Sequence, residues 1–426
     1  MKIFCTPDEN AQIVTDADLK VVLFEKRKSP TNGYAGNKIW KQIKKKKLAP
    51  EPKAWDLLSI ALSVMAADYA GHRGKSHDGW TRVFELTIAV NDKDFWNSQT
   101  ALLSKQLGFL TSDRWSITFI DGGFLPQYKK KEEIQYPKND SIALLSGGLD
   151  SFIGIIDLIE KGVKPYAVSQ MVNDDSKKQK DIVNLFSPAV PLIQLNHNVN
   201  VPDSESPPSQ RARSIIFLAY GVLIASCLEK HKQGQPVTLY MCENGYISLN
   251  PPLTNIRIGS LSTRTTHPIF LKFFQQLLDN SGLQITIENP YQDKTKGEML
   301  KNCLNQNILK SYASQTTSCG RYRVTKHQHC GRCVPCLVRR AAFKKWGVKD
   351  DTTYKYDDLS IKSDDYSNYD DVKSVAMAII EIKEKGLDLW IGASLNTTLL
   401  GDTSRYKNTI EKGLNELKEF LKVYNL

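Results

Sequence analysis

Apolar and polar residues alternate along the middle of the chain in blocks typical of strands and helices. Residues 142–145 form a short apolar run typical of a buried strand, and residues 152–160 are apolar at helical spacing up to Gly162. The alternation continues with expected strands at 165–172, 190–195, 237–242 and 283–291, and expected helices near 211–227, 293–300 and 337–346. This order predicts an α/β fold with a doubly wound parallel sheet in a domain over residues 138–349.

The two flanking regions have different patterns. Before residue 138, apolar helices near 54–66 and 95–110 alternate with half-buried strands at 80–90 and 114–120. This pattern predicts an α+β N-terminal domain over residues 1–137 with antiparallel pairing, bounded by a charged linker that ends in Pro137. Residues 350–426 are charged, and apolar residues at three- and four-residue spacing in 371–383 and 406–421 predict a C-terminal helical extension. We expect it to pack on the core, and a partner-binding surface is the alternative.

The turn after the first strand of the central domain is the strongest candidate for a phosphate site. It consists of Ser146, Gly147, Gly148, Leu149, Asp150 and Ser151. The two glycines let backbone N–H groups approach a phosphate, and the first turn of the following helix carries partial positive charge. Asp150 can cap the helix or hold a magnesium ion beside the phosphates. The turn is not a Walker A loop, since no Gly-Lys-Ser/Thr follows, and an ordinary strand-to-helix turn is the alternative.

Two further segments are expected at the same edge of the sheet. The polar stretch after the strand at 237–242 continues to residue 268 and offers Arg264 and His267 to a purine edge or a phosphate. Lys296, near the start of a helix, is suited to an anion because its charge and the helix dipole act together. We therefore expect catalytic roles for Asp150, Lys296 and Arg264. For Arg264, the alternative is a polar loop whose groups form hydrogen bonds with one another. For His267 it is the start of the next helix, and for Lys296 it is an exposed position on the surface.

Four of the eight cysteines gather late in the chain. Cys319, Cys330, Cys333 and Cys336 supply four thiolates, the number that a tetrahedral structural zinc ion needs. An iron–sulfur cluster could use the same four residues, and His327 or His329 could replace one ligand. The remaining cysteines are scattered, so the pattern does not indicate a disulfide framework.

Charge and hydrophobicity narrow the class of partner. The formal net charge of +11 favours an acidic substrate or partner, such as a nucleotide, a nucleic acid or an acidic protein surface. The basic segment 41–47 ends in four consecutive lysines, 44–47, with no aromatic residue among them. A solvated linker is therefore favoured over a nucleic-acid footprint. No apolar run approaches the length of a membrane span, and the N-terminus lacks the apolar segment of a signal peptide. We expect a cytoplasmic protein with no membrane partner.

Several motifs together resemble one family. The Ser-Gly-Gly-Leu-Asp-Ser turn, residues 213–218, residues 295–298 and Ser318-Cys319 with Cys-Gly-Arg-Cys-Val-Pro-Cys are similar to the QueC family, the 7-cyano-7-deazaguanine synthases of the PP-loop ATP pyrophosphatase superfamily. The resemblance covers residues 140–347, about half of the chain. It implies a PP-loop (adenine nucleotide alpha hydrolase-like) fold, a zinc knob on the four cysteines, and ATP with Mg²⁺ at the turn and at Arg213. It also implies that ATP activates the carboxylate of a 7-carboxy-7-deazaguanine-like molecule as its adenylate.

The chain departs from the synthase pattern at three places. Residues 169–175 replace a Tyr-Gly-Gln-Arg-His type segment, Ser214 stands where the family helix usually has Asn, and residues 262–268 replace a Tyr-Pro-Asp-Cys-Arg type stretch. With its flanking regions, the chain is most similar to the QueC-like proteins of bacterial anti-phage operons, in particular the QatC component of the Qat defence system. That resemblance implies an AMP-forming ligase that transfers the acyl group to an amine of a partner protein from the same operon, at its N-terminus.

Other functions stay open at this point. The alternatives are a 7-cyano-7-deazaguanine synthase proper, a tRNA- or nucleoside-modifying PP-loop enzyme, and a nonenzymatic ATP-binding scaffold in a defence complex. Pyrophosphate release that depends on a 7-deazaguanine carboxylate separates the deazaguanine-activating enzymes from the RNA-dependent enzyme and the scaffold.

Overall fold

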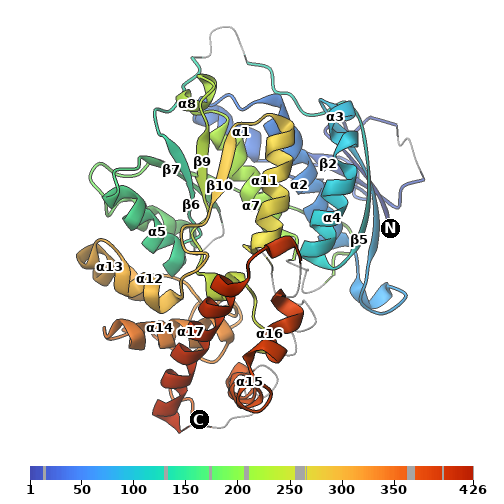
Figure 1. The fold of residues 1–426 in the computed structure, drawn as a ribbon. Coiled ribbons are helices and arrows are strands. Elements are labelled where there is room, and N and C mark those ends of the chain that lie inside the picture. The colour runs from blue at the N-terminus through green and yellow to red at the C-terminus, as the bar shows by residue number, and fades with distance from the viewer. Residues whose placement is uncertain are drawn as a thin grey trace.

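The computed structural model describes residues 1–12, 16–128, 133–171, 175–205, 211–254, 264, 266–361, 370–395 and 398–425. These residues contain two five-stranded sheets with helices around them (Figure 1). The strands of the first sheet are β1 (Lys2–Thr6), β2 (Leu19–Leu23), β3 (Gly33–Ala35), β4 (Val83–Val90) and β5 (Arg114–Asp121). Those of the second sheet are β6 (Ser141–Leu144), β7 (Pro165–Gln170), β8 (Leu192–Leu195), β9 (Val237–Tyr240) and β10 (Ile285–Glu288).

The first sheet is parallel throughout, so the antiparallel α+β arrangement expected for residues 1–137 is wrong. Its order is β3-β2-β1-β4-β5, and each neighbouring pair is parallel. Buried and exposed residues alternate along β5 and at the start of β4, which is the pattern typical of a half-covered antiparallel strand. The short strands β1 to β3, which are absent from the predicted elements, turn this region into an α/β unit. Its helices are α1 (Ile39–Lys45), α2 (Pro52–Ala70), α3 (Lys93–Ser98) and α4 (Thr100–Thr111).

The second sheet confirms the predicted parallel, doubly wound fold. Its order is β10-β9-β6-β7-β8, so the chain moves outward from β6 through β7 and β8 and then returns to the other side of β6. The direction of winding therefore changes between β6 and β9. In open parallel sheets, ligands bind beyond the carboxyl ends of the strands at such a switch point.

Helices α2 and α7 (Arg213–Ala225) lie between the two sheets (Figure 1). Helix α2 is buried along almost its whole length, which explains its lack of a polar face. One hydrophobic core contains side chains from both sheets and both helices. Helix α11 (Pro268–Ser281) completes this layer beside α4.

The remaining helices up to residue 346 lie on the other face of the second sheet and around its two ends (Figure 1). They are α5 (Leu149–Glu160), α6 (Asp175–Val183), α8 (Glu229–Lys232), α9 (Gly245–Ser248), α12 (Lys296–Asn302), α13 (Gln306–Tyr312) and α14 (Val334–Trp346). The helices predicted near residues 371–383 and 406–421 are present as α15 (Asp371–Lys385) and α17 (Ser404–Leu421), with α16 (Leu387–Leu395) between them. Helix α17 packs on α14 (Figure 1) and also contacts α9. Among the described residues, no helix has both the length and the hydrophobicity that crossing a membrane requires.

A buried ion-pair network links the first sheet to α2. Arg82 contacts Asp113 at 2.7 Å and Asp68 at 2.6 Å, and Arg73 contacts Asp113 at 3.1 Å. The Asp68 and Asp113 side chains are fully buried. Asp68 also accepts a hydrogen bond from the backbone N–H of Ala212, just before α7. The network therefore ties the N-terminal region to the helix that begins with Arg213.

We expect Asp113→Ala to lower the free energy of unfolding by roughly 3–5 kcal/mol, because it removes the buried carboxylate that Arg73 and Arg82 share and leaves Asp68 to balance the Arg82 charge. Urea denaturation measures the loss. Asp121→Ala is the matched control, since Asp121 pairs with Lys93 at the surface and its side chain is 71% exposed. The control is expected to cost less than about 1 kcal/mol. Equal losses in the two variants would contradict a stabilising role for the buried network.

Candidate functional site

The glycine turn lies at the switch point, directly after the central strand β6. Gly147 has a φ of +85°, which favours glycine. Gly148 is the N-cap residue of α5, and no side chain caps this helix. The hydroxyl of Ser146 accepts from the Gly148 N–H at 3.2 Å, and the Ser151 hydroxyl donates to the Gly148 carbonyl at 3.0 Å. The uncapped helix start leaves backbone N–H groups that can bind a phosphate.

Asp150 lies at the centre of a buried polar cluster. It is 5% exposed, and its carboxylate contacts the Lys296 ammonium group. The Asn244 side-chain amide donates to Asp150 Oδ2 at 2.7 Å and to Glu243 Oε1 at 3.2 Å. Three segments thus meet here: the start of α5, the residues after β9 and the start of α12. Asp150 does not cap α5, so the helix-capping role predicted as one of its two possible roles is wrong.

The two carboxyl groups of this cluster have opposite pKa shifts. Burial opposes ionisation of Asp150, but the Lys296 ammonium and hydrogen bonds from Glu243, Lys296 and Asn244 lower the pKa of Asp150 to about 2. Burial and the neighbouring Asp150 charge raise the pKa of Glu243 well above its usual range. Asp150 is therefore ionised at neutral pH, and Glu243 is the harder of the two carboxyl groups to ionise. A divalent cation would favour ionisation of Glu243, since its oxygen ligands are preferably anionic.

Lys296 lies where the sequence placed it, at the first position of α12. Thr295 is the N-cap residue, and its hydroxyl accepts from the Glu298 N–H at 3.1 Å. The Glu298 carboxylate accepts from the Thr295 N–H at 2.9 Å, which completes a capping box. Lys296 is 7% exposed, so it is not the surface lysine of the alternative interpretation.

Arg213 lies at the ends of β7 and β8, among side chains that are not in the predicted site. Its Nε donates to Gln170 Oε1 at 3.1 Å, and the Gln170 amide contacts His197 Nδ1 at 3.1 Å. Burial, with the Arg213 charge, lowers the pKa of His197 to about 4, so this imidazole is neutral at pH 7. Lys178 of α6 donates to the Thr317 hydroxyl at 2.5 Å. The Thr317 N–H in turn donates to the Gly147 carbonyl at 3.1 Å, so Lys178 is joined to the turn through one residue.

Arg264 contacts a different part of the molecule. Its guanidinium donates to the Phe109 carbonyl of α4 at 2.8 Å and lies 4.8 Å from the Phe109 ring. His267 is the N-cap residue of α11, where its Nδ1 accepts from the Ile269 N–H at 3.2 Å, as in the helix-start alternative. Residues 255–263 and 265 of the polar stretch, and 172–174 of the altered segment, lie outside the described residues. The catalytic role of Arg264 stays a prediction.

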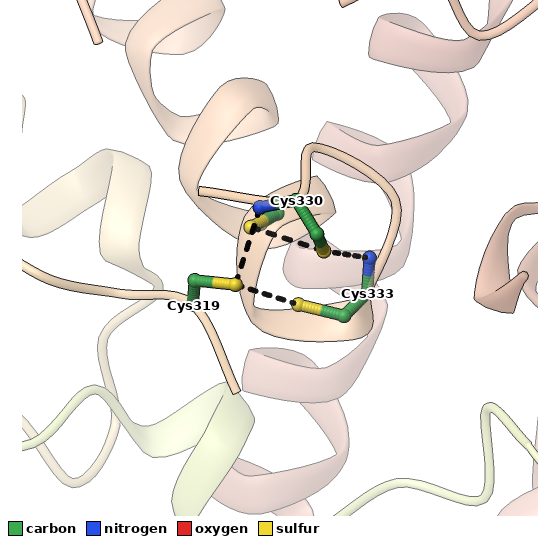
Figure 2. A group of neighbouring side chains, drawn as sticks. Cys319, Cys330 and Cys333 are labelled. Atoms are coloured by element: carbon green, nitrogen blue, oxygen red, sulfur yellow. Dashed lines mark hydrogen bonds between the residues drawn. The ribbon is translucent and has the colours of Figure 1, made fainter. Parts of the chain in front are cut away.

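The four predicted cysteine ligands are together. Their sulfur atoms lie within 4.8 Å of one another, and Figure 2 shows Cys319, Cys330 and Cys333 turned towards a common centre. The Cys319–Cys333 and Cys330–Cys336 sulfur pairs are each 3.9 Å apart. Sulfurs at 2.3 Å from a tetrahedral zinc ion are about 3.8 Å from each other, so this donor set fits zinc.

Neighbouring groups complete the cysteine turn and connect it to the glycine turn. Backbone N–H groups of Arg321 and Cys330 donate to the Cys319 sulfur, each at 3.3 Å. His329 Nε2 accepts from the Ser318 N–H at 3.1 Å, so this histidine supports the turn from outside the four sulfurs. Arg339 of α14 is fully buried and donates to Thr316 and Ser318 at 3.0 and 3.1 Å. These contacts fix the segment through Thr317, which touches Gly147.

Comparison with known proteins points to one family. A family model described as queuosine biosynthesis protein QueC matches residues 265–347. A 7-cyano-7-deazaguanine synthase of Rickettsia felis is 26% identical over 243 residues, which cover 50% of this chain and 98% of the relative. The corresponding synthase of Caldicellulosiruptor bescii is 24% identical over 232 residues, and that of Methanococcus aeolicus is 23% identical over 236 residues. Each match covers 50% of this chain and at least 97% of the relative. With the glycine turn after β6 and the four-cysteine cluster, these matches support the QueC-like PP-loop family for this chain.

Proposed function

We propose that this protein is an ATP-dependent, QueC-like enzyme of an anti-phage defence system. In this proposal it adenylates a 7-deazaguanine carboxylate and transfers the acyl group to an amine at the N-terminus of a partner protein. The observation that carries the ATP-dependent step is the convergence of the glycine turn, Asp150, Lys296 and Asn244 at the switch point of the second sheet.

The described side chains fit ATP with Mg²⁺. The N–H groups of the glycine turn and of the first turn of α5 would hold the pyrophosphate part, with Arg213 and Lys178 as nearby cations. Carboxylate oxygens of Asp150 and Glu243 are the hard ligands that Mg²⁺ prefers, and bound Mg²⁺ would neutralise phosphate charge. Lys296, which contacts Asp150, would add positive charge beside the phosphates. Zinc on the four cysteines would have a structural role.

The proposed reaction has two steps. A carboxylate oxygen of the substrate attacks the α phosphorus, the bond from that phosphorus to the bridging oxygen breaks, and pyrophosphate leaves. The amine nitrogen then attacks the acyl carbon, AMP leaves, and one proton is released as the amide forms. The protein supplies position and charge stabilisation, and the reaction needs no covalent intermediate on a side chain.

The choice of a protein amine as acceptor has separate support. Two regions flank the part of the chain that matches the synthases, and both pack on the central sheet or its helices. Ser214 stands in the buried first turn of α7, beside Arg213, where the family helix usually has Asn. These differences leave the glycine turn intact and alter its surroundings, which favours a changed acceptor over a changed nucleotide.

The second candidate is a 7-cyano-7-deazaguanine synthase proper. The names of the relatives favour it, and it differs in the nitrogen source, which is ammonia, and in a further ATP-driven step from amide to nitrile.

Intact mass spectrometry distinguishes the two candidates. The chain is co-expressed with the proteins encoded beside it in its operon, with Glu160→Gln as a control on the exposed end of α5. We expect one operon protein to gain the mass of a 7-deazaguanine acyl group in the presence of the wild type and the control, and to lose it with Asp150→Ala. Formation of the free nitrile with no protein adduct would contradict the protein acceptor and establish the synthase.

A further inference from the structure

Helix α17 contacts both segments that carry the partners of Asp150. Gly413 faces Tyr246 of α9, two residues after Asn244, and a Cβ on Gly413 would lie 2.2 Å from the Tyr246 ring. Tyr246 is 1% exposed. A side chain at position 413 would therefore push α17 away from the segment after β9.

The second contact of α17 is with the start of α12. Glu416 accepts a hydrogen bond from the Thr295 hydroxyl at 2.5 Å and another from the Gly297 N–H. Lys296 lies between these two donors. A Cβ on Gly297 would lie 2.6 Å from a Glu416 oxygen, and Lys412 pairs with Glu298 at 2.8 Å. Residues 412 and 413 both lie on the same side of α17 as residue 416, since they precede it by four and by three positions.

The polar contacts are not what holds α17 in place. Tyr406, Ile410, Leu417 and Leu421 of α17 belong to the same hydrophobic cluster as Leu337 and Ala341 of α14. This apolar face fixes the helix, whereas Glu416 places a half-buried carboxyl group at the N-terminus of α12. Burying a carboxyl group costs free energy, so a role beyond attachment is indicated.

We propose that α17 is a positioning element for the candidate nucleotide site, in which Gly413 and Glu416 hold Asn244 and Lys296 in place around Asp150. The inference rests on the proposed function, because it assigns the C-terminal extension to the site that would bind ATP.

The charge of Glu416 gives this proposal a pH dependence. Burial raises the pKa of Glu416 to about 7, although the hydrogen bonds from Thr295 and Gly297 lower it. Its charged neighbours are Glu298 of α12, Lys344 and Lys345 of α14, and Lys412 and Glu419 of α17, which line a groove of 440 Å³ with it. The pKa of Glu298 is lowered and that of Lys412 is raised, so both keep their charge near pH 7. Glu416 is ionised above about pH 7 and accepts both hydrogen bonds as an anion, but it is protonated below that pH.

The test uses the full-length chain and the variants Glu416→Gln and Gly413→Ala. Glu411→Gln is the control, because Glu411 is exposed on the same helix. One measurement is the Kd for ATP with Mg²⁺ by calorimetry between about pH 6 and pH 8. The other is the rate at which an acetylating reagent labels Lys296, read by peptide mass spectrometry without ATP.

We expect the wild type and Glu411→Gln to bind ATP more tightly above pH 7 than below it. Glu416→Gln is expected to weaken binding at pH 8 by about threefold to tenfold, to lose the difference between the two pH values, and to speed Lys296 labelling. Gly413→Ala is expected to weaken binding at both pH values. If the wild type binds ATP and both variants bind it with the same Kd, the positioning role of α17 is overturned and the proposed function stays in place. Absence of ATP binding in the wild type would overturn the proposed function, and unchanged Lys296 labelling would then overturn the contact role of α17 as well.

Discussion

Replacing Asp150 with alanine is expected to lower ATP-dependent pyrophosphate release by at least about 100-fold, the order of loss seen when one preorganised electrostatic group is removed from an active site. Asp150 is the shared partner of Lys296 and Asn244, and its carboxylate is ionised at neutral pH. Without it, the site loses a carboxylate for Mg²⁺ and the group that fixes Lys296. Pyrophosphate release is measured with a coupled assay.

A loss of stability must be separated from this loss of activity. Asp150→Ala leaves the Lys296 ammonium buried without a counterion, which costs roughly 3–5 kcal/mol. In the double variant Asp150→Ala/Lys296→Ala, neither charge is present, so the thermal midpoint is expected to recover while activity does not. Glu160→Gln, at the exposed end of the same helix, is expected to behave like the wild type. Recovery of activity together with stability would contradict a direct role for Asp150.

Replacing Cys330 with serine is expected to reduce bound zinc from about one ion per chain to nearly none, because structural zinc requires its full set of four ligands. Cys330 is fully buried, and its sulfur also accepts a hydrogen bond from the Cys333 N–H at 3.3 Å. Binding of a structural metal contributes directly to folding, so a lower thermal midpoint is expected as well. Elemental analysis and thermal denaturation measure the two effects.

Loss of zinc is also expected to weaken ATP binding. The cysteine turn follows Thr317, whose N–H donates to the Gly147 carbonyl. Without zinc, a more mobile cysteine turn would weaken this contact with the glycine turn. Cys303→Ala is the matched control, since it removes another buried thiol that lies outside the four-sulfur cluster. A Cys330→Ser protein that retains one zinc ion would contradict the assignment of the ligands, and one that contains iron would indicate a cluster instead.

The second sheet could be predicted from the sequence because each of its strands is a short apolar run followed by a helical pattern. The first sheet could not, for two reasons. The alternation at the start of β4 and along β5 reflects exposure of one face, and it does not depend on the direction of the neighbouring strand. In addition, β3 has only three residues, Gly33–Ala35, too few for a periodic signal.

The glycine turn and the Cys-x-x-Cys spacings are local patterns that can be read from the sequence. The turn lies between β6 and α5, and the four cysteine sulfurs lie together as expected. The role of the turn in binding ATP stays a prediction. Glu243, Asn244 and Lys178 have no such local signal, because their place in the site comes from tertiary contacts around Asp150 and Thr317. Arg264 is the opposite case, a residue that the sequence places in the site but that contacts Phe109 in the structure. A basic residue in a polar loop has many possible partners, so its sequence position does not determine its contact. The contact between Glu416 and α12 joins residues 121 positions apart and leaves no local signal.

Product analysis of a single reaction tests the central claim most directly. The purified chain is incubated with ATP, Mg²⁺ and 7-carboxy-7-deazaguanine, and the phosphorus-containing products are identified by ³¹P NMR. We expect AMP and pyrophosphate in the presence of the carboxylate and neither in its absence. Formation of ADP and phosphate, or no turnover of ATP by a chain that carries its zinc, would contradict the claim that this glycine turn supports cleavage between the α and β phosphates.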